Sequence, residues 1–122
     1  MIYVPVSVGE LVDKLTILSI KMKKIEDESK LENISKEYGL LHEIKDQIDC
    51  PGLEALENDL EMINELLWTV EDEIRQCDRE KSFQTKFIAL ARSVYQLNDW
   101  RSNIKRKINI LCRSELIEEK SY

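Results

Sequence analysis

Apolar residues in the second half of the chain recur at alternating steps of three and four. The stretch 53–78 keeps this spacing without interruption, and the stretch 83–112 keeps it with one charged exception, Arg101. Such spacing places apolar side chains on one face of a helix. The pattern predicts two long helices over 53–78 and 83–112. Because a short polar turn joins them, we expect them to pack as an antiparallel hairpin.

The first half of the chain predicts two shorter helices. Ser7 and Glu10 have the form of a capping box, which indicates a helix over 8–28. A second apolar pattern over 31–49 ends before Pro51, because proline disfavours helical geometry in the residue before it. The joint between these helices contains no glycine or proline, so one bent helix is an alternative.

Together these elements predict an all-α protein. The five glycine and proline residues are too few for the turns of an all-β fold. Residues 2–6 are mainly β-branched and aromatic with a central proline, which is typical of a short extended arm. We expect a single domain over 1–122, a three- or four-helix bundle dominated by the hairpin, with helix 8–28 packed against it.

The composition of the chain indicates where in the cell this domain is expected and which classes of partner it excludes. The 122 residues are 43% apolar, with no apolar run near the ~20 residues that cross a bilayer. The N-terminus lacks the basic start of a secretory signal. We therefore expect a soluble, cytoplasmic protein without a membrane partner. The net charge of −6 makes nucleic acid an unlikely partner.

The charge is divided unevenly along the chain. Residues 51–80 hold 10 acids against 2 bases, whereas residues 81–113 hold 1 acid against 8 bases. We expect much of this charge to cancel across the seam between the two long helices. The alternative is that helix 83–112 keeps an anion-attracting end.

The cysteines show no metal-site pattern. Cys50, Cys77 and Cys112 have no C-x-x-C spacing, and His42 is the only histidine. A structural zinc site needs about four ligands at short spacings, so we predict neither metal nor cofactor. We expect the cysteines to be small buried apolar residues. No Ser–His–Asp triad can be assembled around this one histidine, and the chain has no glycine-rich phosphate loop.

Arg101 is the most informative exception in the apolar pattern. A guanidinium at a helix seam requires an acceptor, because removing it from water costs several kcal/mol. The antiparallel register brings Glu61 or Glu65 within its reach, with Asp13 or Glu71 as alternatives. Arg101 then fixes the register of the bundle, binds a ligand, or extends to solvent.

Polar and aromatic side chains gather around Arg101 on the predicted helices. They are typical either of a groove for a phosphorylated or carboxylated ligand or of a subunit interface. The candidate site residues are Arg101, Glu71, Asn98, Arg92, Tyr95, Lys105 and Trp68.

Paired carboxylates suggest magnesium as an alternative. Glu54-x-x-Glu57 followed by Leu67-Trp68 partly matches all-α nucleoside triphosphate pyrophosphohydrolases, which hold magnesium between E-x-x-E and E-x-x-D elements. The second element is absent here, because Met62 occupies its first position. Magnesium is therefore expected as a cofactor only if the protein is an enzyme of this kind.

Three segments resemble a known family: residues 4–18, residues 87–95 with Asn98-Asp99, and the ending 118–122. They are similar to a small family of uncharacterised bacterial and phage-type helical proteins of about this length. The resemblance spans essentially the whole chain. It implies a complete protein with its own charged tail, and it implies no activity, cofactor or partner.

The leading functional hypothesis is a helical interaction or assembly module. The apolar stripe of the hairpin runs further than the two shorter helices can cover, so we expect a homodimer that buries the excess, or another protein partner. The alternative is a small-molecule-binding protein or enzyme that uses the polar cluster around Arg101. The sequence leaves enzymatic activity undecided.

Overall fold

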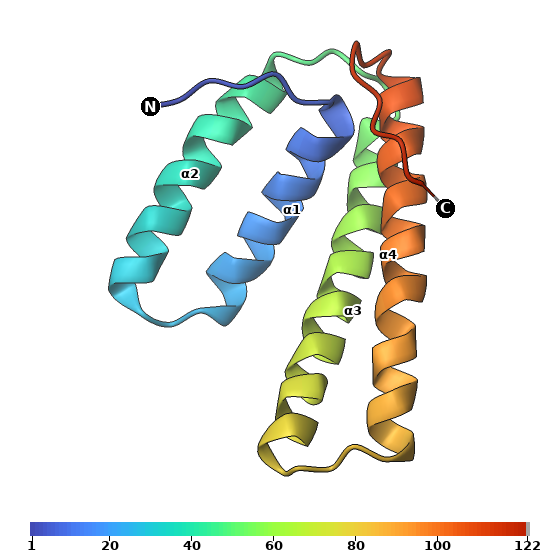
Figure 1. Cartoon of the computed structure of the whole chain (residues 1–122). Coiled ribbons are helices and arrows are strands. Elements are labelled where there is room, and N and C mark those ends of the chain that lie inside the picture. Colours follow the sequence, from blue (N-terminus) through green and yellow to red (C-terminus); the bar gives the residue numbers. More distant parts are fainter. Residues whose placement is uncertain (122) are drawn as a thin grey trace.

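The computed structural model describes residues 1–121 and shows an all-α protein, as predicted (Figure 1). Tyr122, the end of the predicted domain and of the third resembling segment, lies outside the described residues. The helices of this part of the chain are α1 (Val8–Lys24), α2 (Glu28–Asp46), α3 (Leu53–Arg79) and α4 (Thr85–Leu111).

The first two helices are separate, which resolves the open alternative. The Ser7 hydroxyl accepts from the amide of Glu10 and starts α1, as predicted. The Glu10 carboxylate was expected to return to the Ser7 amide, but it contacts the Lys105 ammonium instead at 2.8 Å. After α1 ends, Asp27 accepts from the amide of Lys30 and starts α2. Helix α1 is therefore shorter than predicted.

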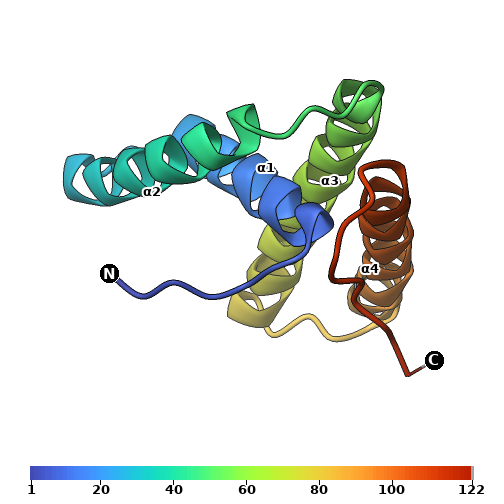
Figure 2. The ribbon, with the colours of Figure 1, turned by 90° about the horizontal axis from the view of Figure 1, so that it is seen from above.

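The predicted hairpin is formed by α3 and α4, which lie side by side and antiparallel (Figures 1 and 2). At ~1.5 Å per residue, each 27-residue helix is about 40 Å long. Helix α1 packs on both helices of the hairpin, and α2 packs on α1. Val12 of α1 meets Leu53, Leu60 and Ile108 of the hairpin in the centre of the core.

Helix α1 covers only part of the hairpin. The part of the hairpin nearer the turn between α3 and α4 extends past α1 (Figure 1). Residues 68–97, most of which belong to this part, are called the projecting half below. The seam of the covered part contains fully buried side chains such as Leu60, Ile63 and Ile108. In the projecting half, the buried seam residue is Cys77 and Phe83 is exposed. The other apolar seam side chains are only partly buried: Val70, Ile74, Phe87, Leu90, Val94 and Leu97.

The expectation for the cysteines was wrong for two of the three. Cys50 and Cys112 form a disulfide, with their Cα atoms 5.4 Å apart. The turn at Pro51-Gly52 places Cys50 beside the end of α4, although 62 residues separate the two cysteines. Cys77 is a free, buried thiol, as expected.

Both ends of the described chain are non-helical. Residues 1–6 form the predicted extended arm, in which Ile2 and Tyr3 are highly exposed. Residues 114–121, called the tail below, run back along α4 (Figure 2). Within residues 1–121, no helix combines the length and apolar character that a membrane span requires.

Candidate functional site

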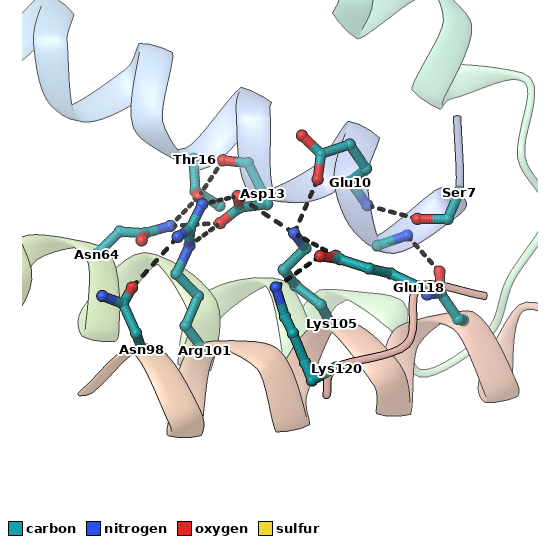
Figure 3. A network of polar contacts seen from close by, with 12 residues as sticks. Ser7, Glu10, Asp13, Thr16, Asn64, Asn98, Arg101, Lys105, Glu118 and Lys120 are labelled. Carbon is teal, nitrogen blue, oxygen red and sulfur yellow. Dashed lines mark hydrogen bonds and ion pairs between the residues drawn. The ribbon is translucent and has the colours of Figure 1, made fainter. Parts of the chain in front are cut away.

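A buried ion pair joins α1 to α4 near the middle of the molecule (Figure 3). Arg101 donates from Nε to Asp13 Oδ1 at 2.9 Å and from Nη2 to Asp13 Oδ2. The Asp13 side chain is 2% exposed and that of Arg101 29% exposed. Hydrogen bonding to Asp13 raises the pKa of Arg101, against the effect of burial. Asp13 was one of the partners that the sequence proposed for this arginine.

Asparagine and threonine side chains complete the surroundings of the Asp13 carboxylate. Asn64 of α3 donates from Nδ2 to Asp13 Oδ1 and to Thr16 Oγ1, both at 2.9 Å. The hydroxyl of Thr16 donates to the Asp13 carbonyl at 2.8 Å. Three helices therefore meet at one carboxylate, and no buried side-chain nitrogen or oxygen of the described chain lacks a hydrogen-bond partner.

Lys105 extends this network towards the N-terminus of α1. Its ammonium lies 2.8 Å from Glu10 Oε2, 3.2 Å from Glu118 Oε2 and 3.9 Å from Asp13 Oδ2. Burial lowers the pKa of Lys105, but hydrogen bonding to Glu10 and the charges of Asp13 and Glu10 outweigh it, so the net shift is upward. Lys105 therefore remains charged and ties α1, α4 and the tail together.

The first turn of α1 is held by α4 and the tail. The Gly9 amide donates to Asn109 Oδ1 at 2.6 Å, and the Val8 amide donates to the Ser114 hydroxyl at 3.0 Å. A Cβ atom on Gly9 would lie 2.6 Å from the Lys105 carbonyl oxygen. Glycine is thus required for α1 to approach α4 this closely.

The tail is bound to α4 through its carboxylates. Glu118 contacts Lys105, and Glu119 contacts Arg106 at 3.0 Å. The pKa of Glu118 is lowered, first by its hydrogen bond with Lys120 and then by that with Lys105. A polar hollow of about 360 Å³ lies between the tail and α4. The tail thus occupies the basic end of α4 that the sequence proposed as an anion-attracting surface.

A second hollow, of about 250 Å³, lies where α1 diverges from the hairpin. Four of the seven candidate site residues line it: Trp68 and Glu71 from α3, and Asn98 and Arg101 from α4. Helix α1 contributes Ile17, Ile20 and Lys21 to the same hollow.

The other three candidate residues lie elsewhere. Lys105 belongs to the network beside the tail, outside the hollow at Arg101. Arg92 and Tyr95 are exposed on α4, on a flank that does not face this hollow. The sequence did not identify Lys21 or Asn109, because each has the polar character that any exposed helical residue shows.

The expected cancellation of charge between the two long helices does not occur through ion pairs. Within residues 1–121, no ion pair joins α3 to α4. Glu61 of α3 pairs with Lys23 of α1, and the cations of α4 pair with α1 and the tail. The reason is geometric: Glu61 and Arg101 both face α1, which supplies their partners.

One of the two carboxylates of the magnesium alternative is engaged elsewhere. Glu57 forms an ion pair with Lys45 of α2 at 2.6 Å. Residues 1–121 contain no group of three or more His, Cys, Asp or Glu side chains placed to hold a metal ion. The geometry therefore adds no support to that alternative.

Comparison with known families gives one match: the model of the Family of unknown function (DUF6165) matches residues 2–122. Comparison with the curated proteins and with the solved structures finds no match. The function must therefore be inferred from the geometry of the chain itself.

Proposed function

The chain belongs to this family of unknown function, and we propose that it is a helical interaction module that forms a homodimer through the projecting half of its hairpin. The observation that carries the proposal is the uneven cover of the hairpin. Where α1 covers the hairpin, most apolar seam side chains are buried, with Leu56, Ile104 and Leu111 as the less buried exceptions. In the projecting half Cys77 is buried and six apolar seam side chains are only partly buried.

A two-helix ribbon cannot bury its own seam on both faces, so the projecting half leaves apolar surface that a further layer of helix would cover. Burying such surface contributes a favourable term of roughly 25 cal/mol per Å² of apolar area, from which the entropic cost of association is subtracted. In the covered half that layer is α1. In the projecting half we assign it to a second copy of the chain.

The charges of the projecting half favour a second copy of the chain over a partner that is purely acidic or purely basic. Residues 68–80 of the projecting half carry five acids and two bases, and residues 81–98 carry three bases and no acid. No ion pair joins the two helices in the described part of the chain. A partner whose surface carries charge of only one sign would be attracted by one helix and repelled by the other. A second copy of the chain offers an acidic helix and a basic helix. Two-fold dimers of this kind are the commonest oligomers.

The test compares two alanines of α4 that differ only in the side they face. Ala91 precedes Asn98 by seven residues and Lys105 by fourteen, which are close to two and four turns of helix. Ala91 therefore lies on the same side of α4 as Asn98 and Lys105, the side that faces α1 in the covered half. Ala89 lies on the opposite side. Both are exposed in the single chain, so Ala91→Glu and Ala89→Glu make the same change of charge and helix propensity.

We expect sedimentation equilibrium at micromolar concentration to give a dimer for the native chain and for Ala89→Glu, and a monomer for Ala91→Glu. Circular dichroism should show the same helix content for all three. A native chain that stays monomeric over this range, or two variants that dissociate equally, would exclude dimerisation through this face.

A further inference from the structure

The hollow beside Arg101 goes beyond the proposed function and does not depend on it. We propose that this hollow, between α1 and the hairpin, is a binding site for a small molecule that carries one carboxylate and an apolar body. Its volume of about 250 Å³ lies just below the ~300–1,000 Å³ of ordinary ligand pockets, which suits a molecule the size of an amino acid.

The carboxylate would bind the free edge of the Arg101 guanidinium. Asp13 takes one hydrogen from Nε and one from Nη2, which leaves three of the five donors. Asn98 takes one of these through Nη1 at a long 3.4 Å, and Asn98 itself lines the hollow. One donor on Nη1 and one on Nη2 therefore remain without a protein partner among these contacts, and Arg101 itself lines the hollow. An end-on carboxylate uses one hydrogen from each of these nitrogens.

The Asp13 pair also makes this guanidinium rigid. Nε and Nη2 are fixed by a carboxylate that is itself held by Asn64. A ligand therefore meets a donor edge whose orientation is already set, and the entropic cost of binding is reduced.

The charge of the lining favours a single carboxylate over a phosphate dianion. Asp13 balances the charge of Arg101. Lys21 balances that of Glu71, so the lining is neutral overall and one added negative charge disturbs it less than two. Neither Lys21 nor Glu71 takes part in any ion pair within residues 1–121. Both charges are thus available to a ligand.

The rest of the lining suits an apolar body. Ile17 and Ile20 of α1 face Leu67 and Trp68 of α3 across the hollow. Trp68 is only partly buried, so its ring offers an apolar surface beside the charged edge. The combination of apolar walls with a few polar groups is typical of small-molecule sites.

The experiment uses three probes of one shape: phenylacetate, the neutral phenylacetamide, and the phenethylammonium cation. The readout is the pair of tryptophan indole N–H signals in ¹⁵N–¹H spectra of the full chain. Trp68 lines the hollow, whereas Trp100 is exposed on α4 outside it and serves as an internal control. The replacements Trp68→Phe and Trp100→Phe assign the two signals.

We expect phenylacetate to shift the Trp68 signal alone, with a dissociation constant at least about tenfold lower than that of phenylacetamide, a difference of about 1.4 kcal/mol. Phenethylammonium should bind more weakly still. Equal binding of the acid and the amide, stronger binding of the cation, equal shifts of both tryptophans, or no shift with any probe would overturn the proposal.

Replacing Arg101 disturbs the fold through Asp13, so two exposed or partly exposed neighbours carry the mutational test. Lys21→Gln removes a positive charge from the lining and should weaken phenylacetate binding severalfold. Glu71→Gln removes the negative charge and should strengthen it severalfold. Neither should change phenylacetamide binding. Variants that change both probes alike, or change neither, would show that the carboxylate does not bind in this hollow.

Discussion

Arg101 and Asp13 are 88 residues apart in the chain, yet the arginine donates two hydrogen bonds to the aspartate across the interface between α4 and α1. The two partners are not equally buried, since Arg101 retains contact with solvent and Asp13 does not. Removing either partner from a buried pair costs about 3–5 kcal/mol when the other is left without compensation.

This asymmetry predicts unequal effects. Arg101→Met leaves a buried carboxylate and should lower the free energy of unfolding by about 3 kcal/mol or more. Asp13→Asn leaves a guanidinium that can reach water. This variant should therefore lose clearly less free energy of unfolding than Arg101→Met. Urea unfolding of both variants and of the double variant gives the coupling. Equal losses of stability in the two single variants would contradict a buried ion pair. So would a double variant whose loss of stability equals the sum of the two single losses.

Two glycines in helices predict changes of opposite sign. A methyl group on Gly9 would collide with the Lys105 carbonyl, so Gly9→Ala should destabilise the chain by about 1–3 kcal/mol through overpacking. Gly39 of α2 has open space around it, so Gly39→Ala should stabilise the chain by about 0.5–1 kcal/mol through helix propensity. Thermal unfolding of the two variants, compared with the native chain, measures both changes in stability. A stabilising Gly9→Ala would show that α1 does not approach α4 this closely.

The Cys50–Cys112 disulfide should contribute strongly to stability. Its 62-residue loop predicts about 4 kcal/mol from reduced chain entropy in the unfolded state. Dithiothreitol should therefore lower the free energy of unfolding of the native chain by about this amount. The Cys50→Ser/Cys112→Ser double variant should already be destabilised and should not respond to the reductant. A native chain that is indifferent to dithiothreitol would exclude the bond. Disulfides persist mainly in oxidising compartments, and the cytoplasmic setting remains a prediction.

Acid should release the tail from α4. The pKa of Glu118 is lowered from its ordinary 4.5 by Lys120 and Lys105. A carboxylate with a lowered pKa in the folded state stabilises it above the ordinary value, and this contribution disappears as the pH falls through the folded-state pKa. The tail should therefore be bound near neutral pH and detach below pH 4.5.

Carboxyl ¹³C titration and tail amide relaxation would measure this release. Glu118→Gln should loosen the tail at neutral pH. Glu115→Gln is the matched control, because Glu115 forms no ion pair in residues 1–121 and its replacement should leave the tail in place. Release of the tail by both variants would assign its binding to something other than Glu118.

The hairpin was predictable because its apolar spacing is regular over both helices, and Arg101 stood out because it is the one charged residue within that spacing. Asp13 could be named only as one of several partners, since nothing local distinguishes it from an exposed carboxylate of α1. The disulfide was missed for a related reason: Cys50 and Cys112 become neighbours only after α3 and α4 have folded back on each other. Local patterns thus predicted the elements, whereas pairings over long sequence distances depended on how the helices pack: the Arg101–Asp13 pair on α1, and the disulfide on the α3–α4 hairpin.

Helix α2 packs on α1 alone, apart from the Lys45–Glu57 ion pair with α3 near its end. Its hydrogen-bonded backbone therefore has the least tertiary support of the four helices. Local opening of such an element requires less free energy than global unfolding. Among the amides that are hydrogen-bonded within helices, exchange should be fastest in α2 and slowest around Leu60 and Ile108, so the molecule would open from α2 inward while the hairpin stays intact.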